Sequence, residues 1–364
     1  MKSDQDKENK ESTMNRSLYR SISTQLRPLP YPNHDFTGKT VLITGANTGL
    51  GLEAARHFVR LNARKVILGC RDLQKGNAAK QDIERTQPSS NGNGSAFTDV
   101  VEIWQVQLHS SDSVKAFCRR AAHTLDRLDI VVENAGVLSQ LYNLAEGYEW
   151  QTKVNVISTW LMALLLLPVL RATKVKYYRT NDSGKNDDIR EGSEVPHLVI
   201  VGSNAHFYTK FEARNETSIF EVYKGGSDLT NRYANTKLMS LFVAREVANR
   251  MVKNKDKPQV VLNIVEPGYC RSQLMREQAL PWYFEILMIV GFATVARTSE
   301  QGSRTYLSAA TAGWESHGMY LEDCKLSAPH EFVDSEEGRK IQTKVYNELM
   351  AILEQIEPGI LQNI

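Results

Sequence analysis

Cysteine is scarce in this 364-residue chain, with only four residues. Cys70, Cys118, Cys270 and Cys324 are dispersed, and no two of them form a C-x-x-C pair. The sequence therefore lacks the spacing of a zinc site and of a disulfide framework. The histidines also lack ligand spacing, so we expect no metal. A reducing compartment, and hence a cytoplasmic location, is the simplest interpretation.

Long apolar runs are missing as well. Residues 1–35 are polar and mixed in charge, without the hydrophobic core of a secretory signal, and we predict a disordered tail there. Residues 156–170 and 282–296 are apolar stretches of about 15 residues, whereas a membrane-spanning helix needs about 20. We therefore predict no membrane span. The first stretch is expected to be a buried helix, and for the second a buried helix, a substrate lid and a surface in peripheral contact with a membrane stay open.

The chain has no strong excess of charge of either sign. Its formal net charge of +2 gives no reason to expect a nucleic-acid partner. With 41% hydrophobic and 24% charged residues, the chain is able to bury a large core. We predict a single domain over residues 36–330 and a C-terminal helical extension over residues 331–364.

Short apolar, β-branched runs alternate with segments of helical periodicity. Such alternation predicts an α/β protein of the Rossmann type, with a doubly wound parallel sheet and helices on both faces. Residues 86–98 and 179–195 are rich in Ser, Gly, Asn and Asp, and they are predicted to be exposed loops. The predicted strands are residues 39–44, 65–70, 99–106, 129–132, 197–201 and 259–265.

A glycine cluster follows the first predicted strand and precedes a helical segment at residues 52–61. Gly45, Gly49 and Gly51 are separated first by three residues and then by one, whereas the common dinucleotide fingerprint has a first gap of one. In such a unit, backbone N–H groups and the helix N-terminus bind a pyrophosphate. The alternative is an ordinary tight turn, which the flanking strand and helix disfavour.

Tyr233 and Lys237 lie four residues apart, about one helical turn, so their side chains share one face of a helix. A phenol and an ammonium placed in this way are able to share a proton-transfer site. Such a pair alone is also typical of an ordinary helix surface. Together with the glycine cluster upstream, the pair indicates a nicotinamide-dependent oxidoreductase.

Residues 36–330 resemble the short-chain dehydrogenase/reductase family, whose motifs are Thr-Gly-x-x-x-Gly-x-Gly and Tyr-x-x-x-Lys. The thirty residues from Ser203 to Tyr233 are similar to the retinol-dehydrogenase-like branch. The segments after residue 296 resemble fungal secondary-metabolism members, many of which act on polyketide or terpenoid intermediates. The resemblance implies a catalytic tetrad of Asn155, Ser203, Tyr233 and Lys237.

The chemistry of carbonyl reduction explains why these residue types are needed. Hydride transfer builds negative charge on the substrate oxygen, which must be hydrogen-bonded and protonated as it forms. Tyr233 would donate the proton, and Ser203 would orient the oxygen. Lys237, which by resemblance also binds the nicotinamide ribose, should lower the pKa of the phenol together with the oxidised nicotinamide. Asn155 would hold a water linked to Lys237. His206 is not expected to be the base, and its position suits a pocket wall.

The tip of the second predicted strand bears on the form of the cofactor. Cys70 stands where an acid would bind the ribose 2′-hydroxyl of NAD, and Arg71 suits a 2′-phosphate. We therefore predict NADP(H); in the alternative, Arg71 is solvated and Asp72 caps the next helix. Glu133 and Gln107 depart from an Asn and an Asp of the family pattern, which leaves adenine contact by Gln107 open. The resemblance implies the following cofactor-binding residues: Gly45, Asn47, Thr48, Gly49, Leu50, Gly51, Arg71, Gln107, Asn134, Tyr233, Lys237, Pro267 and Ser272.

The expected partner is a hydrophobic small-molecule substrate, because residues 282–288 are mostly apolar and suit the wall of its site. The resemblance also implies a homo-oligomer through residues 156–170 and 232–249, and a monomer is equally compatible with the composition. Two rival functions stay open: a cofactor-binding scaffold or sensor without turnover, and a retinoid- or steroid-type dehydrogenase. The intact tetrad counts against the scaffold.

Overall fold

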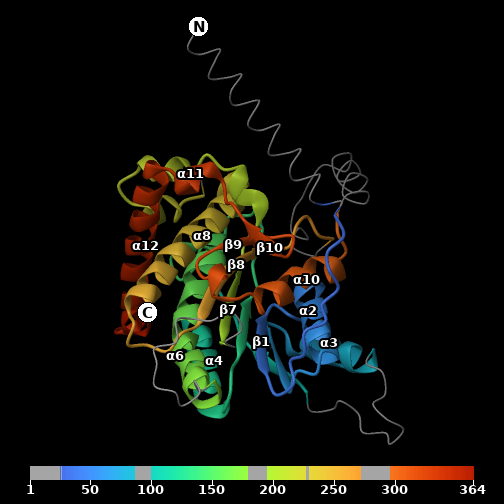
Figure 1. Cartoon of the computed structure of the whole chain (residues 1–364). Helices are drawn as coiled ribbons and strands as arrows, with labels where there is room; N and C mark the ends of the chain where they lie inside the picture. Colours follow the sequence, from blue (N-terminus) through green and yellow to red (C-terminus); the bar gives the residue numbers. More distant parts are fainter. Residues whose placement is uncertain (1–24, 26, 87–99, 179–194, 227–228, 272–295) are drawn as a thin grey trace, which may run out of the picture.

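The computed structural model describes residues 25, 27–86, 100–178, 195–226, 229–271 and 296–364. An eight-stranded sheet in the order β10-β9-β8-β7-β4-β1-β2-β3 runs through its centre (Figure 1). Each neighbouring pair is parallel except β9 and β10. The strands are β1 Thr40–Thr44, β2 Lys65–Cys70, β3 Val101–Gln105, β4 Ile130–Glu133, β7 His197–Val201, β8 Val261–Glu266, β9 Tyr320–Glu322 and β10 Lys325–Ser327; β5 Leu144–Ala145 and β6 Tyr148–Glu149 form a separate hairpin.

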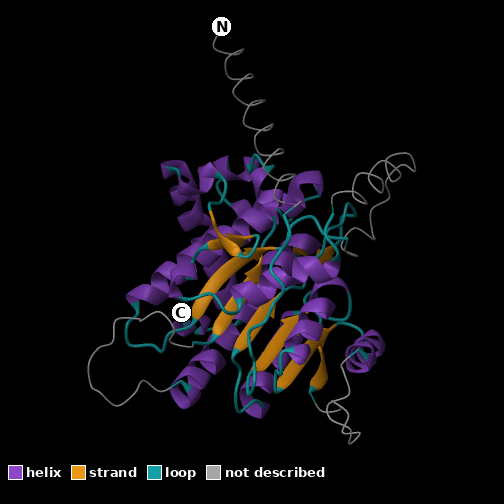
Figure 2. Cartoon of the chain, turned by 45° about the vertical axis from the view of Figure 1, so that its right-hand side comes forward, coloured by secondary structure: helices purple, strands orange, loops and turns teal. Residues whose placement is uncertain are grey.

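Helices cover both faces of the sheet, as predicted for a doubly wound fold (Figure 2). Alternate residues of one strand point to opposite faces, so Leu42 lies in one core and its neighbours Val41 and Ile43 lie in the other. The core that contains Leu42 is built with α4 Ser111–Thr124, α6 Thr159–Tyr177, α8 Leu229–Lys253 and α12 Glu336–Ile356, and the other core with α2 Gly49–Arg60, α3 Leu73–Arg85 and α10 Ser299–Ala309. The short helices are α5 Trp150–Thr152, α7 Ile219–Val222 and α11 Glu331–Asp334.

All six predicted strands are present, with ends that differ from the prediction by at most two residues. Their β-branched runs are buried on both faces, which is the pattern of a central parallel strand. The sequence analysis did not predict β9 and β10. These strands have three residues each, too few to show a periodic pattern, and pairing with β8 extends the sheet.

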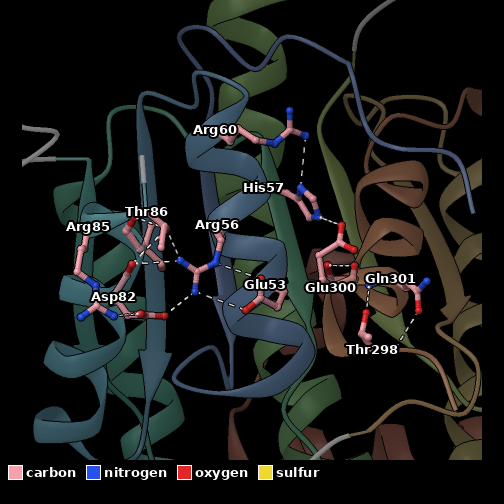
Figure 3. A network of polar contacts seen from close by, with 12 residues as sticks. Glu53, Arg56, His57, Arg60, Asp82, Arg85, Thr86, Thr298, Glu300 and Gln301 are labelled. Atoms are coloured by element: carbon pink, nitrogen blue, oxygen red, sulfur yellow. Dashed lines mark hydrogen bonds and ion pairs between the residues drawn. The ribbon is translucent and has the colours of Figure 1, made fainter. Parts of the chain in front are cut away.

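An ion pair and a hydrogen bond join α2 to its two neighbouring helices (Figure 3). Arg56 of α2 binds Asp82 of α3, with Nη2 2.5 Å from Oδ2. His57 of α2 contacts Glu300 of α10, with Nε2 2.9 Å from Oε1. A capping box that begins at Thr298 fixes the start of α10. These contacts hold the first helix of the dinucleotide-binding unit against the outer helices.

Residues 27–35, predicted to be part of a disordered tail, are packed against the domain. Residues 27–35 lie against α2 and α10, where the ring of Tyr31 sits beneath the guanidinium groups of Arg60 and Arg304. The same arginines donate to backbone carbonyls of the segment, from Arg60 to Pro32 and from Arg304 to Leu29, each at 2.8 Å. Polarity suggested a solvated tail, but two cations on the folded domain bind backbone carbonyls of this segment and the ring of Tyr31. Residues 1–24 and 26 lie outside the described residues.

The first apolar stretch lies within a longer helical run, Trp150–Tyr177, that includes α5, a π-helical turn at Lys153–Ser158 and α6. By length and composition this run is able to cross a membrane, but most of its apolar window is buried inside the fold. The interior of the domain therefore accounts for its apolar character, in agreement with the predicted buried helix. The second stretch, apart from Ala296, lies outside the described residues.

The C-terminal extension contains α11 and α12, and it is part of the main core. α12 packs along α8 and buries Val345, Leu349 and Leu353 in the same cluster as the sheet. The terminal carbonyl of Ile364 accepts hydrogen bonds from Asn254 and Lys257 at the end of α8. Part of the surface expected to form an oligomer is thus in contact with the chain's own C-terminus, and the oligomer stays a prediction.

Candidate active site

A cavity of about 660 Å³ opens at the carboxyl ends of the parallel strands. Its walls are the segments that follow β1, β2, β3, β4, β7 and β8, together with residues of α8 and α10. β4 and β2 lie on opposite sides of β1, so the strand order reverses here, and open α/β sheets bind their ligands at this point. Of the predicted residues, the cavity is lined by Gly45, Asn47, Thr48, Gly49, Leu50, Arg71, Asn134, Ser203, Tyr233, Lys237 and Pro267.

The glycine turn has the tight geometry that its sequence predicts. Gly45 and Gly49 have φ angles of +65° and +61°, in the left-handed region that favours glycine. Gly51 does not line the cavity, and its role is close packing. A Cβ at Gly51 would lie 2.7 Å from Nδ2 of Asn134 and 2.8 Å from the carbonyl oxygen of Gly45. Only glycine therefore lets the N-terminus of α2 approach the end of β4.

Asn134 holds the glycine turn from the neighbouring strand. Its Nδ2 donates to the carbonyl oxygen of Thr44 at 2.7 Å, and its Oδ1 accepts from the hydroxyl of Tyr306 at 2.9 Å. Tyr306 comes from α10, lines the cavity and was not predicted. In the sequence, Tyr306 is only an aromatic residue of the segments after residue 296. Nothing in the sequence pattern indicates that it contacts the glycine turn after β1.

The tip of β2 places two cations on the cavity wall. Arg71 and Lys75 both line it. Asp72 caps α3 by accepting from the backbone N–H groups of Gln74 and Lys75 at 2.9 and 3.1 Å, so the alternative interpretation of Asp72 is confirmed. Lys75 was missed, although its position one helical turn after Arg71 was a usable signal.

Gln107 is less well placed for the predicted adenine contact. Its neighbours Val106 and Leu108 line the cavity, but Gln107 does not. Its backbone N–H donates to the hydroxyl of Ser113 at 2.9 Å, which fixes the start of α4. Adenine contact by Gln107 stays a prediction.

Ser203, Tyr233 and Lys237 meet in the wall of the cavity, as predicted. The hydroxyl of Ser203 is hydrogen-bonded to the side chain of Tyr233. The Nζ atom of Lys237 lies 5.6 Å from the centre of the Tyr233 ring and donates to the carbonyl oxygen of Val201 at 2.8 Å. Ser203 follows the end of β7, and Tyr233 and Lys237 lie on one face of α8. The hydrogen bond from Lys237 to Val201 ties this face of α8 to the end of β7.

Asn155 lies behind this group and does not line the cavity. It sits in the π-helical turn, a feature often found at functional sites. Its Oδ1 accepts from the N–H of Val137 at 2.8 Å, and its Nδ2 donates to the carbonyl oxygen of Val137 and to the hydroxyl of Thr236. Both ends of the side-chain amide are thus engaged by the protein, and the water-holding role of Asn155 stays a prediction. Asn155 positions the loop after β4 against the helix that carries Lys237.

Burial dominates the protonation of Tyr233 and Lys237. It raises the pKa of Tyr233 to about 12, and Glu266 adds to the rise, while the hydrogen bond with Ser203 opposes it. Burial also lowers the pKa of Lys237 to about 8. Burial thus sets the direction of the phenol's pKa in the chain without a cofactor. The predicted lowering by Lys237 together with the oxidised nicotinamide stays a prediction. Near pH 7, Tyr233 is a neutral phenol with a proton to donate.

Glu266 is a second buried acid in the cavity wall that the sequence analysis missed. It ends β8 and is hydrogen-bonded to the backbone N–H groups of Gly268 and Asn204. Burial raises its pKa to about 8, and the charge of Glu322 adds to the rise. A carboxylate at the end of a buried strand, directly before Pro267, was a usable signal. Ser272, which like Pro267 is predicted to bind the cofactor, lies outside the described residues.

A smaller recess of about 230 Å³ adjoins the cavity on the other side of Tyr233. The two spaces share Tyr233, Leu138, Ala205 and Tyr208. The recess also contacts Gln151 and the first turn of α8. Tyr233 thus lines both the large cavity and the recess. Among the described residues, no group of three or more His, Cys, Asp or Glu side chains is able to hold a metal ion.

Comparisons with known proteins agree with this geometry. The family described as short chain dehydrogenase matches residues 39–175. Short chain dehydrogenase/reductase dmxR8 of Cryptosporiopsis sp. (strain 8999) is 35% identical, over 94% of this chain and 98% of its own. Short chain dehydrogenase atnD of Emericella nidulans is 40% identical, over 84% of this chain and 90% of its own.

Solved structures share the fold at lower identity. An uncharacterised protein from Mycobacterium paratuberculosis has a TM-score of 0.60 at 21% identity, covering 89% of this chain and 95% of its own. A short chain dehydrogenase from Shigella flexneri 2a, complexed with NADP, has a TM-score of 0.51 at 19% identity, covering 81% of this chain and 100% of its own. The sequence relatives extend the match over nearly the whole chain. This protein belongs to the short-chain dehydrogenase/reductase family of oxidoreductases.

Proposed function

We propose that this protein is an NADP(H)-dependent enzyme that interconverts a hydrophobic ketone or aldehyde and its alcohol. One observation carries the proposal. The phenol of Tyr233 is hydrogen-bonded to Ser203 beside Lys237, in the wall of a cavity whose other end is the glycine turn. A neutral acid and a dinucleotide-sized space therefore meet at one site.

The residues present fit a nicotinamide dinucleotide. The close approach that Gly45 and Gly51 allow leaves backbone N–H groups at the start of α2 for the pyrophosphate. Arg71 and Lys75 would hold a 2′-phosphate, and Lys237 would hold the nicotinamide ribose. When bound, the cofactor supplies a hydride to the carbonyl carbon or accepts one from the alcohol carbon.

The side chains at the junction of the two cavities handle the proton. In reduction, Tyr233 gives its proton to the carbonyl oxygen while the hydroxyl of Ser203 holds that oxygen in place. Lys237, with a pKa of about 8, is mostly an ammonium near pH 7 and stabilises the phenolate that remains. In oxidation the same groups act in reverse order. A positioned general acid of this kind contributes about 10²- to 10⁴-fold to the rate.

The phosphorylated cofactor is favoured by the two cations at the tip of β2. Arg71→Ala should weaken NADPH binding by about 10- to 100-fold, because a charge-assisted hydrogen bond contributes about 1.5–3 kcal/mol. NADH, which has no 2′-phosphate, should bind almost as before. Parallel fluorescence titrations of both cofactors measure the effect.

A matched control is Arg85→Ala. Arg85 is an exposed cation in the last turn of α3 that pairs with Asp82 and does not line the cavity, so its loss should leave both affinities unchanged. Equal losses of NADPH and NADH affinity in Arg71→Ala would contradict the 2′-phosphate role. A loss of the same size in Arg85→Ala would assign the effect to overall charge.

The substrate class is inferred from the walls of the cavity and from resemblance. Leu138, Trp150 and Val154 contribute apolar surface beside Tyr233, which supports a hydrophobic substrate. The resemblance of the segments after residue 296 to fungal secondary-metabolism members supports a secondary metabolite of the polyketide or terpenoid kind. A retinoid or steroid is the alternative, supported by the resemblance to the retinol-dehydrogenase-like branch.

NADPH consumption with a panel of carbonyl compounds tests the proposal. The panel contains aromatic polyketide-like ketones, terpenoid ketones and aldehydes, retinal and a ketosteroid. We expect turnover with at least one hydrophobic class and none with small polar ketones. Cofactor binding without turnover on any class would contradict the proposal and favour the scaffold or sensor function.

A further inference from the structure

His206 joins the catalytic serine to the C-terminal extension. The side chain is 3% exposed and lines neither cavity, so it does not meet a ligand directly. Its Nδ1 lies 2.7 Å from the carbonyl oxygen of Ser203. Its Nε2 lies 3.3 Å from the backbone nitrogen of His330, just before α11. One imidazole therefore bridges segments that are more than one hundred residues apart in the chain.

The two backbone partners fix the protonation state of this ring. A carbonyl oxygen only accepts, so the proton must lie on Nδ1 to bind Ser203. An N–H only donates, so Nε2 must be unprotonated to bind His330. Neither the other neutral tautomer nor the imidazolium satisfies both contacts. The ring is thus held as a neutral imidazole in a single tautomer.

The two ends of the bridge are anchored in different ways. On one side, the edge of Tyr320 in β9 packs on the His206 ring, with the ring centres 5.1 Å apart. On the other, the His330 side chain caps α11 by accepting from the N–H of Phe332 at 3.1 Å. α11 leads directly into α12, which packs along α8, the helix that carries Tyr233. The extension therefore contacts the elements that carry both catalytic hydroxyl groups.

The contact with Ser203 has a direct consequence for its side chain. Ser203 is extended, with φ −166°, and its hydroxyl accepts from the N–H of Ala205 at 3.1 Å while it is hydrogen-bonded to Tyr233. Holding the carbonyl of Ser203 fixes the peptide plane that follows it. The ring nitrogen of His206 at 2.7 Å and its backbone N–H at 3.5 Å both contact this carbonyl, so His206 holds the residue from which the hydroxyl extends toward Tyr233.

We propose that His206 is a positioning residue for Ser203. The backbone N–H of His330 holds His206 in the Nδ1-protonated tautomer, and through this bond the C-terminal extension helps to position Ser203. This inference rests on the proposed function, because Ser203 is the serine to which that function assigns the substrate oxygen.

Two substitutions separate the two hydrogen bonds. In H206N the amide nitrogen takes the place of Nδ1, so the bond to Ser203 is kept and the bond to His330 is lost. In H206Q the terminal amide takes the place of Nε2, so the bond to His330 is kept and the bond to Ser203 is lost. We expect H206Q to lower kcat by about tenfold with an unchanged Kd for NADPH, the size of effect that the loss of one hydrogen bond produces. H206N should stay within about threefold of the original kcat.

A matched control is H317N. His317 is also a partly buried histidine between two backbone groups, the N–H of Leu262 and the carbonyl of Ala248, and it does not line the cavities. Its replacement should lower the melting temperature as H206Q does and leave kcat unchanged. Equal kcat in H206Q and H317N, at equal loss of stability, would overturn the positioning role.

The tautomer is measured without any substrate. Nitrogen-15 NMR of the histidine-labelled full chain should show the His206 ring protonated at Nδ1 near pH 7.5, with the signal assigned by its loss in H206N. Protonation at Nε2 would overturn the bridge itself. A chain that binds NADPH and turns over no carbonyl would instead overturn the proposed function, and the NMR result would still decide whether the bridge exists.

Discussion

Replacing Tyr233 with phenylalanine should lower turnover by about a thousandfold or more and leave the Kd for NADPH within about twofold. The substitution removes the one hydroxyl that is hydrogen-bonded to Ser203 and faces both cavities. The ring stays, so Lys237 keeps its neighbour and its bond to the carbonyl of Val201. Turnover is followed as NADPH consumption with the best carbonyl of the panel, and binding by fluorescence titration.

Tyr346→Phe provides the matched control for this substitution. Tyr346 is a buried tyrosine of α12, packed beneath the guanidinium of Arg250 and away from both cavities. Loss of its hydroxyl should leave turnover unchanged. Activity that survives in Tyr233→Phe at more than about a tenth of the original rate would contradict the assignment of Tyr233 as the proton donor.

Replacing Glu133 with glutamine should stabilise the protein by about 3 kcal/mol near pH 7 and by about 1 kcal/mol near pH 5. Glu133 lies buried at the end of β4, where its Oε2 accepts from the hydroxyl of Thr44 at 3.3 Å and its Oε1 has no hydrogen-bond partner. Burial raises the pKa of this carboxyl from 4.5 to about 8.

The direction of this pH dependence follows from comparing the protonation of Glu133 in the folded and unfolded chains. Between pH 4.5 and about 8 the carboxyl is ionised when unfolded and protonated when folded, so the stability that it contributes falls as the pH rises. Glutamine does not titrate, so its advantage grows with pH and levels off above about 8. Any packing difference is the same at each pH. Urea unfolding of both proteins at pH 5, 6, 7 and 8 measures the trend, and a difference that does not change with pH would contradict it.

Glu102→Gln is the control with the opposite expected trend. Burial raises the pKa of Glu102, but hydrogen bonds from Lys65 and Trp104 outweigh it and hold the pKa below its usual value. Its ionised form is therefore favoured by folding. The glutamine variant should be less stable than the original protein near pH 7, and the loss should shrink toward pH 4.

The sequence was sufficient to predict the elements that local patterns determine. Buried β-branched runs identified the six long strands, and the family resemblance implied that Ser203, Tyr233 and Lys237 belong to one site. Strands as short as β9 carry no pattern of their own and form only because β8 offers an edge. Contacts of Tyr31 with arginines on two helices were invisible for the same reason, since they depend on packing between distant segments.

Within the site, the sequence predicted the positions of the motif residues better than it predicted their pKa values and hydrogen-bond partners. The spacing of Tyr233 and Lys237 correctly predicted that they share one face, but the direction of the pKa of the phenol depends on how much water the fold removes. The motif also gave no hint that both ends of the Asn155 amide are bound by the protein. Lys75 and Glu266 could have been predicted as residues of the site, because each is a charged residue close to a motif residue in the sequence. Tyr306 was not, because its link to the glycine turn runs through Asn134.

Parallel fluorescence titrations of the purified chain with NADPH and NADH test the central claim most directly, because they need no substrate. A nicotinamide dinucleotide site built from the glycine turn, Arg71 and Lys237 predicts saturable binding, with NADPH at least about tenfold tighter than NADH. Absence of binding by either cofactor would contradict the assignment of the cavity and, with it, the catalytic role of Tyr233.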